Sequence, residues 1–283
     1  MAEYFTSRGL PVPRELARNP LTDWRRLGSV AAVLVVLFIG FRIVDVDLSR
    51  ANPPYMAGVL RQLVDFDFSV LWPHGEFETF WDGGLGLMII TIFLGIMGTA
   101  FAMVVAIPLS FLGARNIMTG HPITNGIYVI IRLLFTIVRS IDVLIVCIIA
   151  VILFGLGNAA GVLAIAFHNV GVMGKLYSEA IEGIDHGPIE AITATGANRF
   201  QVIWTAVLPQ IVNPFISFTI YRADTNVRLA PILGLVGGGG IGQPLFQNIQ
   251  LLQYRAAGTF ILLIVVTVAV MDFVSAQVRR RLI

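Results

Sequence analysis

Charged residues are scarce in this sequence. Asp, Glu, Lys and Arg together make up 13% of the 283 residues, whereas soluble domains carry about 25%. Hydrophobic residues make up 57%, and the mean hydropathy is +0.84. This composition excludes an ordinary soluble domain and indicates an integral membrane protein, surrounded by lipid.

Cysteine and histidine are also rare. The single cysteine, Cys147, excludes an intrachain disulfide, and its apolar surroundings predict a small buried hydrophobic residue. The four histidines are too scattered to favour a metal cluster. We therefore expect this chain to hold no metal and no cofactor of its own.

Motifs for catalysis and nucleotide binding are missing as well. The sequence has no Walker phosphate-binding motif, no nucleophile elbow and no constellation of nucleophile and base. It also lacks the internal repeat that is typical of many secondary transporters. We predict that the chain is not an enzyme, that any ATP and Mg²⁺ it depends on bind to another chain, and that it has no nucleic-acid partner.

Positive charge is concentrated at the two ends of the chain. Before the first apolar run come Arg8, Arg14, Arg18, Arg25 and Arg26, and after the last one come Arg279, Arg280 and Arg281. Arginine and lysine are enriched in the cytoplasmic parts of membrane proteins. We therefore expect segment 1–27 and the tail 279–283 to be cytoplasmic.

Six apolar runs are long enough to cross a bilayer, which takes about 20 residues. They are 28–46, 85–112, 124–154, 159–180, 209–231 and 257–278. The third run contains Arg132, Arg139 and Asp142, and two short spans broken at "RSID" are the alternative to one span. The prediction is an all-α membrane protein with about six transmembrane helices and both termini inside.

The connecting segments agree with this topology. Segment 47–84 falls outside, is acidic, and is interrupted by proline and tryptophan, so we expect an external cap with short helices. Segment 232–256 also falls outside, and segment 181–208 falls inside. Within 181–208, Pro188 follows a plausible N-cap at Gly187, and Gly196 is placed to end the first helix in a left-handed turn.

A second, amphipathic helix is predicted after Gly196. Its apolar positions Phe200, Ile203, Trp204 and Val207 share one stripe, and Pro209 is expected to open the next span. Such an element lies along the cytoplasmic face, where it either docks into a partner's groove or caps the helix bundle.

The same stretch, "EAITATGANRFQVIWTAVLP", resembles the EAA loop of binding-protein-dependent ABC importer permeases. Matching positions are Glu190, Ala191, Gly196, Leu208 and Pro209, whereas Ile192 and Ala206 replace family residues with other apolar ones. The resemblance implies a type I ABC importer permease fold in the cell (inner) membrane. It implies that this loop, including Ala197 and Phe200, couples the chain to a separate ATPase subunit.

Four further stretches resemble the phosphonate-type permeases over the permease core, roughly 85–278. They are "RSIDVLIVCIIAVILFGLG", "GVLAIAFHNVGVMGKLYSEAIEGID", "YRADTNVR" and "ILGLVGGGGIG". The resemblance implies import of phosphonate, phosphite or phosphate from an external binding protein, by a permease homodimer with two ATPase subunits. An ABC permease for another solute such as methionine, or a stand-alone channel or secondary carrier, are the rival hypotheses.

Ionisable residues inside the spans are costly and therefore candidates for function. The predicted substrate pathway contains Arg139, Arg222, Asn226 and Arg228. The structural alternative pairs Arg139 with Asp142, and Asp224 with Arg228. His168 and Asn169 are expected to form hydrogen bonds between helices.

Four consecutive glycines, Gly237, Gly238, Gly239 and Gly240, are predicted to form a tight turn at the external gate. Their amide groups are also candidates to bind an anion, as backbone nests do.

Overall fold

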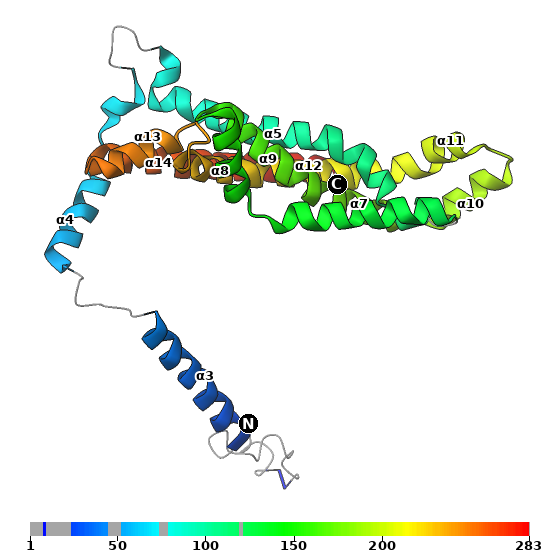
Figure 1. Ribbon diagram of the computed structural model, residues 1–283, viewed down its shortest axis with the longest axis horizontal. Coiled ribbons are helices and arrows are strands. Elements are labelled where there is room, and N and C mark those ends of the chain that lie inside the picture. The colour runs from blue at the N-terminus through cyan, green and yellow to red at the C-terminus, as the bar shows by residue number, and fades with distance from the viewer. Residues whose placement is uncertain (1–7, 10–23, 45–51, 74–78, 119–120, 283) are drawn as a thin grey trace. The chain divides into compact units, whose positions relative to one another are not determined.

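The computed structural model describes residues 8–9, 24–44, 52–73, 79–118 and 121–282, and every regular element in these ranges is helical (Figure 1). The chain divides into two compact units, Met1–Ala57 and Gly58–Ile283. The first unit contains α3 (Trp24–Ile43), and α4 (Pro53–Val64) begins in it. From Leu27 to Ile43 the sequence of α3 is apolar on every face apart from Ser29 and Arg42, which is typical of a helix that lies in lipid.

The second unit is a bundle of long apolar helices. Within the described residues, five helices are long and apolar enough to span a membrane. They are α5 (Gly84–Leu112), α7 (Pro122–Ser140), α9 (Asn158–Glu182), the continuous helix Phe200–Leu235 that contains α12 (Leu208–Leu235), and Tyr254–Val278 of α14 (Tyr254–Leu282). The prediction of an all-α membrane protein is confirmed.

Short helices connect the long ones. They are the 3-10 helices Phe68–Leu71 and Phe80–Asp82, then α6 (Arg115–Met118), α8 (Val143–Phe154), α10 (His186–Ala194), α11 (Arg199–Val202) and α13 (Gly242–Gln250). The short helices expected in the external cap are therefore present, apart from the parts of 47–84 at 47–51 and 74–78, which lie outside the described residues.

The run 124–154 is not one continuous helix. Helix α7 ends at Ser140, and Asp142 caps α8 by accepting a hydrogen bond from the Leu144 N–H at 2.8 Å. The Ile141 carbonyl accepts a hydrogen bond from His168 Nδ1 of α9 at 3.0 Å. The helix breaks here because a side-chain cap and a neighbouring helix satisfy the backbone groups that the break exposes.

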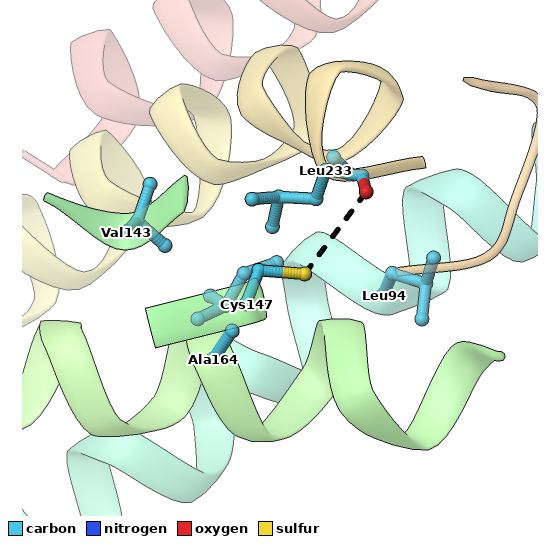
Figure 2. Packing of buried hydrophobic residues seen from close by; sticks show 7 residues of the cluster. Leu94, Val143, Cys147, Ala164 and Leu233 are labelled. Atoms are coloured by element: carbon cyan, nitrogen blue, oxygen red, sulfur yellow. Dashed lines mark hydrogen bonds between the residues drawn. The ribbon is translucent and has the colours of Figure 1, made fainter. Parts of the chain in front are cut away.

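The two pieces follow α9 one after the other. Phe135 of α7 lies against Gly174, whereas Cys147 of α8 shares a buried cluster with Ala164, more than two turns closer to the start of α9. Figure 2 shows the Cys147 Sγ atom between α9 and α12, pointing toward the Leu233 carbonyl at 4.0 Å. Cys147 is buried, as predicted.

Small residues set the spacing of the bundle. A Cβ at Gly98 of α5 would lie 2.5 Å from Ile165 Cγ2 of α9, and one at Gly95 would lie 2.7 Å from the Val227 nitrogen of α12. Because lipid tails are as apolar as the side chains, close packing through small residues is what holds helices together in a membrane. The α5–α9 pair, with α12 across it, forms the frame for the polar residues described below.

Candidate functional site

The stretch 185–209 forms one end of the bundle, away from α13 (Figure 1). Its first helix, α10, begins at His186 and is capped by Asp185, whose carboxylate accepts from the Gly187 N–H at 3.1 Å. The predicted N-cap at Gly187 is therefore wrong by two residues. An aspartate side chain outcompetes glycine because it supplies the acceptor that the first N–H groups lack.

Gly196 ends this helix as predicted. It adopts φ +82°, directly after the C-cap Thr195, and its N–H donates to the Thr193 carbonyl at 3.0 Å. A Cβ at this position would meet no atom within 4 Å. The demand for glycine is therefore conformational and not steric.

The second helix does not stop at Pro209. Asn198 and Gln201 cap it reciprocally, at 2.8 and 2.9 Å, and it continues through a π-helical turn, Ile203–Val207, into α12. Pro209 lies in the first turn of α12, as expected, but the preceding helix runs into α12 without a break. Proline lacks an N–H and crowds the preceding turn, and a wider turn accommodates it without ending the helix.

The predicted apolar stripe divides between two environments. Val207 is buried in a cluster with Ile181 and Ile211, whereas Phe200 and Trp204 are 85% and 72% exposed. Glu190 is exposed as well. The loop therefore presents two aromatic side chains that nothing in the described part of the chain covers, beside a fixed glycine turn.

Changing Gly196 to valine tests this loop. A β-branched residue at positive φ costs about 1–2 kcal/mol, so the turn is expected to rearrange and uptake to fall several-fold while the protein still inserts. The measurement is co-purification of the ATPase subunit together with uptake. Gly187→Ala is the matched control, since Gly187 lies in α10 without a positive φ. Normal uptake with an intact complex in Gly196→Val contradicts a coupling role.

Arg222 is a half-buried cation of the bundle. Its Nε and Nη2 atoms donate to Asn169 Oδ1 of α9 at 2.9 and 2.7 Å, and no acidic side chain of the described residues pairs with it. The interhelical hydrogen bonds expected of His168 and Asn169 are both formed. Arg222 lies near the middle of α12. Its positive charge has the neutral amide of Asn169 as its hydrogen-bond partner among the described side chains.

Arg139 is exposed at the end of α7, where α7 crosses Gly171 of α9. The alternative in which it pairs with Asp142 is wrong, because the described residues offer it no ion pair and Asp142 caps α8 instead. Gly171 is two residues from Asn169, so Arg139 and Arg222 reach α9 at about the same level but on faces roughly 200° apart.

Two other predicted pathway residues, Arg228 and Asn226, bind side chains of neighbouring helices. Arg228 forms the expected ion pair with Asp224, and its Nη2 also lies 3.0 Å from Asp272 of α14. Asn226 is 1% exposed and donates to Thr99 Oγ1 of α5 at 2.7 Å. The sequence-based prediction did not include Asp272. The signal was present, because Asp272 is the one carboxylate in the last apolar run.

Arg132 is likewise tied to its neighbours. Its Nη2 lies 2.6 Å from Glu182 of α9, and its Nε donates to the Gly113 carbonyl at 2.8 Å. These bonds join α7 to α9 and to the end of α5. Of the four arginines in the third and fifth predicted spans, only Arg139 and Arg222 keep a charge that no described carboxylate compensates.

The glycine turn is packed tightly. Gly237, Gly239 and Gly240 have positive φ values, and all four glycines are buried. The N–H of Gly240 donates to Asn158 Oδ1 at 3.1 Å, and that of Gly238 to the Leu233 carbonyl at 2.9 Å. The expectation that these amides bind an anion is wrong for Gly238 and Gly240, because the chain itself uses them.

Comparisons with known proteins agree with this geometry. Residues 124–283 match the family described as "Binding-protein-dependent transport system inner membrane component". The phosphite transport system permease protein PtxC of Stutzerimonas stutzeri is 34% identical over 99% of both chains. The phosphate-import permease protein PhnE of Mycolicibacterium smegmatis is 36% identical over 70% of this chain and 36% of its own length.

The fold has solved counterparts too. A structure of the MetNI methionine ABC transporter in an inward-facing conformation superposes with a TM-score of 0.55, covering 82% of this chain and all of that one, at 20% identity. At this identity the likeness concerns the fold alone.

Proposed function

Because this chain belongs to the family of binding-protein-dependent transport system inner membrane components, we propose that its substrate is a phosphorus oxyanion: phosphonate, phosphite or phosphate. The chain is a permease subunit of an ABC importer and a multi-pass protein of the cell membrane. It performs no covalent chemistry. ATPase subunits and an external binding protein are its partners, and ATP hydrolysis switches it between outward and inward access.

The observation that carries the substrate proposal is the environment of Arg222. A guanidinium has more N–H donors than the two that Asn169 engages, and the remaining ones suit the oxygens of a phosphorus oxyanion. A positive charge without a compensating carboxylate costs free energy inside a membrane protein. Its presence therefore indicates a function. An anion that passes this point supplies the missing negative charge.

The proposal includes a topology of six crossings with both termini inside. Helix α8 has 12 residues, about 18 Å of helix, and is too short to cross a hydrocarbon core of about 30 Å. Since α7 and α8 follow α9 in succession, together they supply one crossing. With α3, the count is six, and the exposed Phe200 and Trp204 face the cytoplasm.

Assembly as a homodimer with two ATPase subunits also belongs to the proposal. Arg139 is exposed and Arg222 is only half-buried in the single chain, so a second copy would be needed to enclose a pathway that includes them. The loop at Glu190, Gly196 and Phe200 then meets one ATPase subunit in each half.

Reconstitution tests the function directly. The permease is placed in proteoliposomes with its ATPase subunit and its binding protein, and uptake of phosphate, phosphite and methylphosphonate is measured with and without ATP. Uptake of at least one of these anions, dependent on both ATP and binding protein, is expected, with no competition by methionine. ATP-independent uptake, or ATP-driven uptake of methionine alone, contradicts the proposal.

Arg139→Gln separates a pathway role from a structural one. Because Arg139 has no ion pair in the described structure, its loss is expected to leave thermal stability unchanged while uptake falls several-fold. Adding Asp142→Asn, which retains an N-capping residue, is expected not to restore uptake. Recovery of uptake in the double variant removes Arg139 from the pathway.

A further inference from the structure

A polar pocket lies at the end of the bundle opposite the coupling loop. It has a volume of about 380 Å³, in the range of about 300–1,000 Å³ that ligand sites occupy. Its walls are the start of α5, the start of α9, the glycine turn and α13. Its lining includes Trp81, Asp82, Asn158, Gly239, Gln243 and Gln247.

Asp82 determines the sign of charge that this pocket accepts. Among the described residues that line the pocket, it is the one that is ionisable. Its Oδ2 accepts from the Thr79 N–H and Oγ1, each at 2.8 Å, and these bonds lower the pKa of the carboxyl, so that it is ionised at neutral pH. Oδ1 has no hydrogen-bond donor among the residues that the structure describes. A phosphorus oxyanion would be repelled here, so the occupant is a cation.

The other walls suit a guanidinium or an ammonium group. Trp81 offers an aromatic face, on which cations are attracted by the ring electrons. The side-chain carbonyls of Gln243 and Gln247 are hydrogen-bond acceptors for N–H groups. A carboxylate, an indole and amides together make a site for one basic side chain.

The position of the pocket connects it to the glycine turn. Asn158, a wall residue, also accepts the Gly240 N–H at 3.1 Å, and the adjacent Ile241 N–H donates to Thr91 Oγ1 of α5 at 2.8 Å. A group that enters the pocket therefore contacts Asn158, one of the two residues that hold the turn in place.

The acidic residues of segment 47–84 favour a protein as the source of the cation. The segment 47–84 has more acidic than basic residues, and one of its acidic residues, Asp65, is paired with Arg255 at 3.1 Å. An acidic outer surface attracts the basic rim of a partner and orients it. A free anionic substrate is attracted to neither feature.

We propose that the pocket around Asp82 and Trp81 receives a lysine or arginine side chain of the external binding protein, which docks there against the glycine turn. This assignment rests on the proposed function. It adds a specific anchor on the outer face and the chemistry of the partner residue that fills it.

The test measures how tightly the binding protein engages the intact transporter. The permease–ATPase complex is placed in lipid nanodiscs, and ATPase activity is titrated with substrate-loaded binding protein. Asp82→Asn, which keeps an oxygen for Thr79, is expected to raise the half-saturating concentration about tenfold with an unchanged maximal rate. Gln247→Glu, which adds a second carboxylate, is expected to lower it. High salt should reduce both differences.

Asp65→Asn is the matched control, because it removes a carboxylate at the same end of the bundle but outside the pocket, and it is expected to shift the titration less than twofold. An equal shift in Asp65→Asn and Asp82→Asn, no shift in Asp82→Asn, or weaker engagement in Gln247→Glu overturns the assignment. A wild-type transporter that binding protein does not stimulate overturns the proposed function as well.

Discussion

Replacing Arg222 with glutamine is expected to lower uptake of the phosphorus oxyanion by about 10- to 100-fold, the effect of losing a charged hydrogen-bond donor. Its guanidinium is held only by Asn169, and no described carboxylate depends on it. Removal strands no buried negative charge, and the glutamine amide can still donate to the buried Asn169 Oδ1, so stability is expected to stay close to that of the wild type. Uptake in proteoliposomes and thermal unfolding of the purified complex measure the two effects.

The combination of lost uptake and retained stability is what identifies a pathway residue. Arg222→Lys keeps the charge but not the planar fork of donors, and intermediate uptake is expected. Arg132→Gln is a useful contrast, because Arg132 is paired with Glu182 and its loss is expected to lower stability. If Arg222→Gln unfolds the protein, or leaves uptake intact, the anion does not pass by this residue.

Gly239→Ala is expected to have the largest effect on folding. Gly239 has φ +81°, which costs an alanine about 1–2 kcal/mol. The new Cβ would also overlap Asn158 Oδ1 and lie 2.8 Å from the Asn158 nitrogen, and overpacking adds about 1–3 kcal/mol. The thermal midpoint and the yield of folded protein are the measurements.

Gly155→Ala separates strain from crowding. Gly155 has φ +83°, but a Cβ there would meet nothing within 4 Å. Only the conformational cost applies, so the loss of stability is expected to be clearly smaller than for Gly239→Ala. Equal losses in the two variants would show that the glycine turn is not held against α9 as tightly as the structure has it.

The sequence by itself determined the class of protein and its local conformations. Few charges and long apolar runs require a membrane, and arginine at both ends predicts the orientation. The Asp224–Arg228 pair was predictable because residues four apart share a helix face. The turn at Gly196 was predictable because glycine adopts a positive φ without strain. Each of these inferences needs only residues that are close along the chain.

Only the tertiary structure decided which charges are compensated and where the helices break. Arg228 is bound by Asp272 and Arg132 by Glu182, partners 44 and 50 residues away in the sequence, so spacing along one helix could not reveal them. The helix break at Asp142 depends on a hydrogen bond from His168 of another helix. Hydrogen bonds to Asn158 and Thr91 fix the glycine turn. In a low-dielectric interior, a polar group's role depends on the partner that satisfies it, and packing selects that partner.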